Sequence, residues 1–272
     1  MSEFTVQRAG VTLAGEEAGA GTPVVLAHGL TATRRYVVMG SGALERSGHR
    51  VVSYDARGHG RSSPAPAPGD YGYEALAADV LALLDDRGIE RAVLAGASMG
   101  AHTIVRLALD HGDRVAGLAI VTPAYTPEGE STSLERWDAL SEGLRRGGVE
   151  GFVAAYGDLG VPDAWRATVT KVLRQRLAAH EHPDAVADAL HAVPRARAFE
   201  DWAELDELAL PCVVVASRDD ADPGHPYAVG ARYAEAIPGA ELLSEAPGAS
   251  PLAWQGGQLS KVIADLAARS AA

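Results

Sequence analysis

Cysteine is nearly absent from the sequence. Cys212 is the only one among 272 residues, so no disulfide can form within the chain. It heads the apolar stretch PCVVVAS, where a thiol serves as a small hydrophobic side chain. We therefore expect no catalytic thiol.

Positive charge is also scarce. The chain has 24 lysines and arginines against 36 acidic residues, a net charge of −12. Nucleic acids and anionic membranes are bound through basic patches, so we expect neither as a partner. The N-terminus MSEFTVQRAG lacks the regions of a signal peptide, and no apolar run approaches the roughly 20 residues of a membrane helix. These absences predict a cytoplasmic protein with a small-molecule substrate, and they leave a homo-oligomer open.

Signals for metals and cofactors are missing as well. The histidines show no H-x-x-x-H or H-E-x-x-H spacing. His180 and His182 are two residues apart, and such residues do not face one another on a helix. No G-x-G-x-x-G follows a strand-like run. We therefore expect neither a metal nor a dinucleotide.

The sequence does contain short, nearly continuous apolar runs that alternate with helical patterns such as Tyr73–Arg87. This alternation is typical of a mostly parallel sheet, buried on both faces and covered by helices. The first twenty residues favour an antiparallel ribbon that leads into the sheet. The predicted buried strands are Pro23–Gly29, Arg50–Gly58, Arg91–Ser98, Val115–Pro123, Pro211–Ser217 and Ala240–Ala246.

The alternation is interrupted once. Residues 125–208 contain no strand candidate, and their pattern predicts a helical cap inserted into an α/β core of residues 1–124 and 209–272. Ligands of such sheets bind at the carboxyl ends of the strands, which a cap at this point would enclose. The predicted cap helices are Ser133–Arg146, Glu150–Tyr156, Pro162–His180 and Ala185–Val193.

The most informative motif is Gly96-Ala97-Ser98-Met99-Gly100, a match to G-x-S-x-G between a predicted strand and a predicted helix. The glycines allow a sharp turn that exposes the hydroxyl of Ser98. The start of the following helix directs N–H groups and a positive dipole end toward a developing oxyanion. This context predicts a nucleophile elbow.

Two further motifs follow predicted strands. In LAHGLTATRR, the amide of Leu30 is a candidate oxyanion donor beside that of Met99, and His28 is interpreted as a structural hydrogen-bonding residue. In YDARGHGRSS, a glycine-rich turn, His59 is expected to lie in an exposed surface loop.

In this order, the motifs HGL, DARGHGRS and GASMG, the helical stretch, and the segments SRDDADPGHP and AEAIPGAELL resemble the α/β-hydrolase fold family. The similarity is to its esterase, haloperoxidase and lactonase-type members, and it spans nearly the whole chain. It implies a triad in the order Ser, Asp or Glu, then His. Ser98 matches the nucleophile, and the amides of Leu30 and Met99 match the oxyanion hole.

The resemblance also implies an acid. Asp222, four residues before Pro226, matches the D-x-x-x-P loop of the family, with Asp219 and Asp220 as alternatives. The match fails at the histidine, which would fall near Ala249 or Ser250. Ser250 cannot act as a base near neutral pH, and removing the histidine of a triad costs up to about 10⁶ in rate.

The general base must then come from elsewhere, because no histidine follows His225. His225 is favoured, since it shares a loop with Asp222 and follows the flexible Gly224. His102 lies one helical turn after Ser98 and is a second candidate. The histidines of the predicted cap, or no base at all, remain open: His180, His182 and His191.

These residues predict an enzyme that cleaves a small carboxylic ester, thioester or lactone through an acyl-Ser98 intermediate. The cap would supply part of an apolar wall, from side chains that could equally form its core: Trp137, Phe152, Tyr156 and Trp165. Two alternatives stay open. One is a ligand-binding protein that keeps the fold without turnover, and the other is a lyase or proton-abstracting enzyme in which Ser98 only binds an oxyanion.

Overall fold

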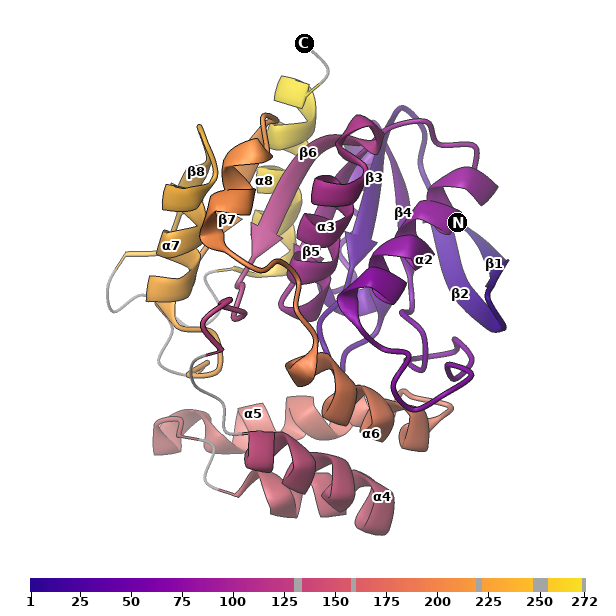
Figure 1. Cartoon of the computed structure of the whole chain (residues 1–272), viewed down its shortest axis with the longest axis vertical. Coiled ribbons are helices and arrows are strands. Elements are labelled where there is room, and N and C mark those ends of the chain that lie inside the picture. The colour runs from indigo at the N-terminus through magenta and orange to yellow at the C-terminus, as the bar shows by residue number, and fades with distance from the viewer. Residues whose placement is uncertain (130–133, 158–159, 219–221, 247–253, 271–272) are drawn as a thin grey trace.

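A computed structural model describes residues 1–129, 134–157, 160–218, 222–246 and 254–270. Its centre is an eight-stranded sheet with strand order β1-β2-β4-β3-β5-β6-β7-β8 (Figure 1). The strands are β1 Ser2–Arg8, β2 Val11–Ala18, β3 Thr22–Ala27, β4 His49–Tyr54, β5 Ala92–Ala97, β6 Val115–Val121, β7 Cys212–Val215 and β8 Glu241–Leu243.

The sheet is parallel from β4 to β8 and antiparallel at its N-terminal edge. β1 pairs with β2, and β2 with β4, in antiparallel register, while Val25 of β3 lies opposite Leu94 of β5 in a parallel pair. All six predicted buried strands and the antiparallel ribbon are present. The prediction was wrong in one respect: β8 is an edge strand whose Glu241 and Leu242 are exposed, because only β7 pairs with it.

Helices cover both faces of the sheet. Their bounds are α1 Ala43–Arg46, α2 Tyr73–Asp86, α3 Met99–Asp110, α4 Leu134–Tyr156, α5 Asp163–Leu177, α6 Pro183–Ala192, α7 Tyr227–Ala236 and α8 Gly256–Ser270. Short 3₁₀ helices are η1 Arg34–Tyr36, η2 Gly112–Arg114, η3 Val193–Arg195 and η4 Trp202–Glu207. No helix among the described residues is long and apolar enough to cross a membrane.

Two hydrophobic clusters fix the layers. On one face, side chains of α2, α3 and α7 pack on the sheet, with Leu84, Ile104 and Tyr233 fully buried. On the other face, α1 and α8 pack on it through Leu44 and Ile263. The sheet is thus buried between two helical layers, which is why its central strands are apolar on both faces.

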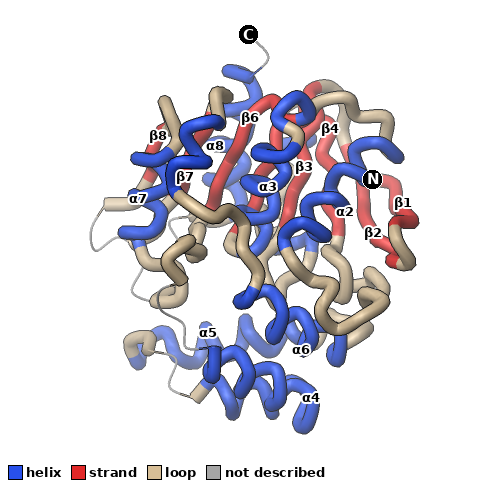
Figure 2. Tube along the Cα trace, viewed as in Figure 1, coloured by secondary structure: helices blue, strands red, loops and turns tan. Residues whose placement is uncertain are grey.

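Helices α4, α5 and α6 form a separate cluster around Leu144, Phe152 and Leu190. They lie together below the sheet in Figure 1, at the end toward which β6 points, and Figure 2 shows loops gathered between them and the strands. A second face of α6 packs on the main cluster through Ala185 and Ala189. The division into core 1–124 and 209–272 and cap 125–208 stays a prediction.

Candidate active site

The turn between β5 and α3 is sharply bent at Ser98. Its backbone has φ 51° and ψ −117°, and its carbonyl accepts the first helical hydrogen bond, from the amide of His102 at 3.1 Å. Gly100 lets α3 start so close to the sheet, because a Cβ there would lie 2.0 Å from the carbonyl oxygen of Ala27. The strand, the strained serine and the helix form the elbow that G-x-S-x-G predicts.

Two backbone amides lie beside Ser98. Met99 opens α3, and Leu30 follows Gly29, whose Cα is so close to Ser98 that an added Cβ would be 3.3 Å from the serine Cβ. Neither amide donates a hydrogen bond to another group in the described ranges. Both N–H groups are therefore without an acceptor among the described residues.

The turn that carries Leu30 is strained. The amide of Ala32 donates to the carbonyl of Gly29 at 3.0 Å, and Thr31 within this turn has φ 65°. A left-handed backbone costs a non-glycine residue about 1–2 kcal/mol. Such a conformation persists only where the surrounding contacts hold it.

Asp222 and His225 form a hydrogen-bonded pair in the loop after β7. Both carboxylate oxygens lie 2.8 Å from Nδ1 of His225, which donates its proton to them. Burial raises the pKa of Asp222, but the bonds to His225 and the charge of Arg176 outweigh it and lower this pKa. The carboxylate thus stays ionised and fixes the tautomer in which Nε2 of His225 carries the lone pair.

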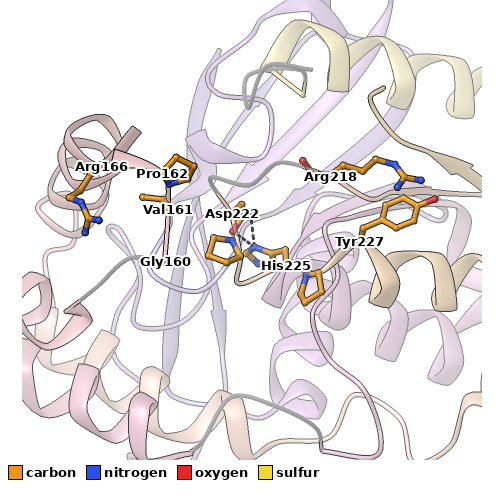
Figure 3. A pocket seen from close by; sticks show the side chains of 11 residues that line it. Gly160, Val161, Pro162, Arg166, Arg218, Asp222, His225 and Tyr227 are labelled. Atoms are coloured by element: carbon orange, nitrogen blue, oxygen red, sulfur yellow. Dashed lines mark hydrogen bonds and ion pairs between the residues drawn. The ribbon is translucent and has the colours of Figure 1, made fainter. Parts of the chain in front are cut away.

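This pair lines a cavity of about 760 Å³. In Figure 3, Asp222 and His225 lie between the segment Gly160–Pro162, which precedes α5, and the side chains of Arg218 and Tyr227. Arg218 stacks on the ring of Tyr227, 3.5 Å from its centroid. The lining residues are Gly160, Val161, Pro162, Arg166, Ser217, Arg218, Asp222, Pro223, His225, Pro226 and Tyr227.

Ser98 is not one of the residues that line this cavity. Hydrogen bonds link the ends of three neighbouring strands. After β5, the amide of Ser98 donates to the carbonyl of Val121 in β6 at 3.0 Å, and after β6 the amide of Thr122 donates to the carbonyl of Val215 in β7 at 2.8 Å. β7 is two strand spacings from β5, or about 10 Å. Ser98 Oγ forms no hydrogen bond to His225 or to another described residue. The structure therefore brings Asp222 and His225 together, and places Ser98, Leu30 and Met99 together two strands away.

His102 cannot serve as the base in this arrangement. Its side chain is buried, Nδ1 bonds the hydroxyl of Tyr73 at 3.0 Å, and Nε2 accepts the amides of Ala124 and Tyr125 at 3.0 and 3.1 Å. Burial lowers its pKa to about 3. A histidine with both nitrogens committed has no lone pair for a serine proton, so the hypothesis that His102 is the base is wrong.

The histidines of the predicted cap are placed differently from one another. His180 uses both nitrogens, accepting the amide of Gly60 at 2.8 Å and donating to the carbonyl of Thr31 at 3.0 Å. His191 is exposed and bonds Asp138 at 2.8 Å. His182 precedes the first turn of α6. His180 is thereby excluded as a base, since no nitrogen remains.

His28 has the structural role that the sequence favoured, donating to the carbonyl of Gly29 at 2.8 Å and accepting the amide of Ala56 at 2.9 Å. The expectation that His59 is exposed was wrong. It is 1% exposed, and its ring centroid lies 5.2 Å from that of His28 and 5.5 Å from that of His180. The segment after α5 that carries His180 lies against it.

Three of the four aromatic residues predicted for the cap belong to the cluster of α4, α5 and α6. Phe152 is fully buried there, with Trp137 and Tyr156 packed against it. They contribute to this cluster, which also contacts the side chain of Leu30. Trp165 is half-buried and is not part of this cluster.

Two residues were missed by sequence reasoning. Arg176 of α5 bonds the carbonyl of Leu30, and Glu245, after β8, accepts bonds from Ser217 and Trp254 at 2.8 and 2.7 Å. Neither lies in a local motif, because its partners are distant in sequence. The positions expected for the family's histidine, with Ser250, and the alternative acids Asp219 and Asp220 lie outside the described residues.

The strand order, the elbow at Ser98 and the two free amides define a class of protein. Residues 22–156 of the chain match the α/β-hydrolase fold family. The RutD protein of Variovorax paradoxus, named as a carbamate hydrolase, is 33% identical over 74% of this chain and 75% of its own length. The chain belongs to the α/β-hydrolase family.

Solved structures agree with this assignment over nearly the whole chain. The enol-lactonase of Burkholderia xenovorans has a TM-score of 0.77 and 25% identity, covering 97% of this chain and 99% of its own. A thermophilic esterase of Thermogutta terrifontis has a TM-score of 0.78 and 25% identity, covering 99% of each chain. Both superpose on the described core and on the helices below it.

Proposed function

We propose that this protein is a hydrolase that cleaves a small carboxylic ester, thioester or lactone through an acyl-Ser98 intermediate. The observation that carries the proposal is the Asp222–His225 pair. Asp222 holds Nδ1 of His225 at 2.8 Å, and Nε2 has no partner among the described residues. His225 has the tautomer of a general base, beside a cavity at the carboxyl ends of the strands.

Three other histidines near the strand ends support this choice, and His59, whose Nε2 has no partner among the described residues, is buried beside the rings of His28 and His180. Both nitrogens of His28, His102 and His180 are engaged in hydrogen bonds within the described structure. His225 is also close enough to His102, one turn behind Ser98, to lower its pKa. The acid and the base would therefore share one loop, instead of following two different strands.

In the proposed reaction, Ser98 Oγ attacks the carbonyl carbon while its proton passes to Nε2 of His225. The amides of Leu30 and Met99 donate to the oxyanion. The tetrahedral intermediate collapses to the acyl-enzyme, and His225 protonates the leaving oxygen or sulfur. A water then gives a proton to His225, attacks the acyl carbon and releases the acid and Ser98.

The substrate class follows from the site and from the relatives. An oxyanion hole with an activated serine suits acyl transfer, and the enol-lactonase and the esterase are named for cleaving carboxylic esters. A cavity of about 760 Å³ suits a small organic molecule. No metal or cofactor is part of the proposal.

Covalent labelling with a fluorophosphonate, read as an intact-mass shift, tests this proposal. We expect wild type to be labelled, Ser98→Ala not at all, and His225→Ala at least about 10³-fold more slowly. His191→Ala is the matched control, because His191 forms the same kind of pair with Asp138 on the surface and its loss leaves labelling unchanged.

Any other labelling result contradicts a specific part of the proposed function. Normal labelling of His225→Ala would remove His225 as the base. Wild type without any label would contradict acyl transfer itself. Tight ligand binding without turnover would then favour a binding protein, and deuterium exchange into a bound ligand would favour proton-abstraction chemistry.

A further inference from the structure

The C-terminal end of α5 and the residues just after it are hydrogen-bonded to the turn that carries Leu30. Nη2 of Arg176 donates to the carbonyl of Leu30 at 2.9 Å and to Oγ1 of Thr31 at 3.0 Å. Nε2 of His180 donates to the carbonyl of Thr31 at 3.0 Å. Three bonds from one element of the predicted cap thus converge on two consecutive residues.

These bonds hold the strained part of the turn. Thr31 has φ 65°, and rotation of the peptide between Leu30 and Thr31 would release it from the left-handed region. The carbonyl of this peptide is the one that Arg176 binds. Rotation would turn the carbonyl away from Arg176, so the hydrogen bond opposes the relaxation.

His180 adds a second restraint. Its Nδ1 accepts the amide of Gly60 at 2.8 Å, which leaves the proton on Nε2 and directs it to Thr31. The side chain of Leu30 also packs against the cluster of α4, α5 and α6. The conformation of the turn therefore depends on contacts that are distant in sequence.

Arg176 itself is placed for support and not for ion pairing. Its Nε is buried without a hydrogen-bond partner, and its guanidinium lies over the ring of Tyr36, 5.7 Å from the centroid. It forms no ion pair with a carboxylate among the described residues. The side chain is half-buried, and the donors of Nη2 go to a backbone carbonyl and a threonine hydroxyl instead of a carboxylate.

We propose that Arg176 and His180 are positioning residues that hold the Leu30–Thr31 peptide and, through it, the adjoining Gly29–Leu30 peptide, whose N–H faces the oxyanion formed at Ser98. The inference rests on the proposed function, because it concerns the oxyanion hole of the same reaction. It adds that the hole is completed by α5, and that loosening α5 weakens transition-state stabilisation.

The test is the kinetics of fluorophosphonate labelling, separated into the affinity KI and the maximal rate kinact. Losing one oxyanion donor costs about 10²–10³ in rate, so we expect kinact of Arg176→Ala to fall by about 10–100-fold with little change in KI. Ethylguanidinium should restore part of the rate. Arg174→Ala is the matched control, since Arg174 lies on the same helix, exposed and paired with Glu150.

Two further readouts separate this role from a general structural one. Arg176→Lys keeps a donor for the Leu30 carbonyl and should retain more of kinact than Arg176→Ala, even if the alanine variant folds poorly. The charge of Arg176 also lowers the pKa of Asp222, so the pH profile of kinact is compared between wild type and Arg176→Ala. A loss of kinact that persists on the plateau above the transition supports action through the turn, whereas a loss confined to a shifted transition would assign the effect to the Asp222–His225 pair and overturn the proposal.

Failure of the positioning role and failure of the proposed function give different results. Wild type and Arg176→Ala labelled at equal rates would overturn the positioning role and leave the proposed function intact. Wild type without label would overturn the proposed function and, with it, an oxyanion hole to be positioned. A lowered melting temperature with unchanged kinact below it would show that Arg176 supports only the fold.

Discussion

At the scale of single residues, the site depends on which histidine nitrogen is free. Hydrogen bonds commit both nitrogens of His102 and His180, whereas His225 is held through Nδ1 alone. Asp222 fixes this arrangement, because both its oxygens accept from Nδ1. The role of the carboxylate is thus to select a tautomer as much as to supply charge.

Replacing Asp222 with Asn tests that role. The amide would present an N–H to Nδ1 and favour the proton on Nε2, the wrong tautomer for a base. We expect fluorophosphonate labelling of Ser98 to slow by about 10²–10⁴-fold. Asp138→Asn, which alters the corresponding pair with His191, is the control. Unchanged labelling of Asp222→Asn would show that the pair does not serve Ser98.

At the scale of elements, α4 shows how one residue divides a helix. The sequence predicted two helices with a break between 146 and 150, and the structure has helical residues throughout Leu134–Tyr156 except at Gly148, with φ 57° and ψ −145°. Such a backbone is accessible to glycine and strained for other residues. The break lets the two parts of α4 pack closely against each other. Their contact is at Gly143, where an added Cβ would lie 2.6 Å from the carbonyl oxygen of Gly151.

Adjacent glycines should therefore respond oppositely to alanine. Gly148→Ala forces a side chain into the left-handed region and is expected to destabilise the protein by about 1–2 kcal/mol. Gly147 has no positive φ, and no atom would lie within 4 Å of an added Cβ. Gly147→Ala should stabilise by up to about 1 kcal/mol. Urea unfolding of both variants checks this, and equal effects would contradict a break fixed by Gly148.

At the scale of the whole molecule, three histidines are held in their neutral forms where the C-terminal end of α5 meets the strand-end loops. Burial lowers the pKa of His28 and of His59, and lowers that of His180 to about 4. Protonation of any of them would place a charge beside the others and beside Arg176. The contact between α5 and the strand-end loops is therefore sensitive to acid.

Stability should fall as the pH is lowered. A lowered pKa means that the unfolded chain binds more protons below its ordinary value of 6.5, so the stabilisation is complete above that pH and is lost toward about 4. For His180 alone this amounts to about 3 kcal/mol. Melting temperatures across this range check it. The melting temperature of His180→Asn should depend less steeply on pH than that of wild type, whereas that of the exposed His191→Asn should depend on pH as steeply as wild type. A melting temperature of wild type that does not change with pH would contradict the burial of these groups.

The sequence by itself determined the positions of the buried strands along the chain, the elbow at Ser98 and the absence of a histidine after His225. Buried strands and sharp turns are encoded by residues adjacent in the chain, so their patterns can be read locally. Tertiary structure decided that both nitrogens of His102 and His180 are engaged while only Nδ1 of His225 is, that His59 is buried, and that Arg176 contacts the turn of Leu30. The Arg176–Thr31 bond joins residues 145 positions apart, and no local pattern predicts a contact made only by folding.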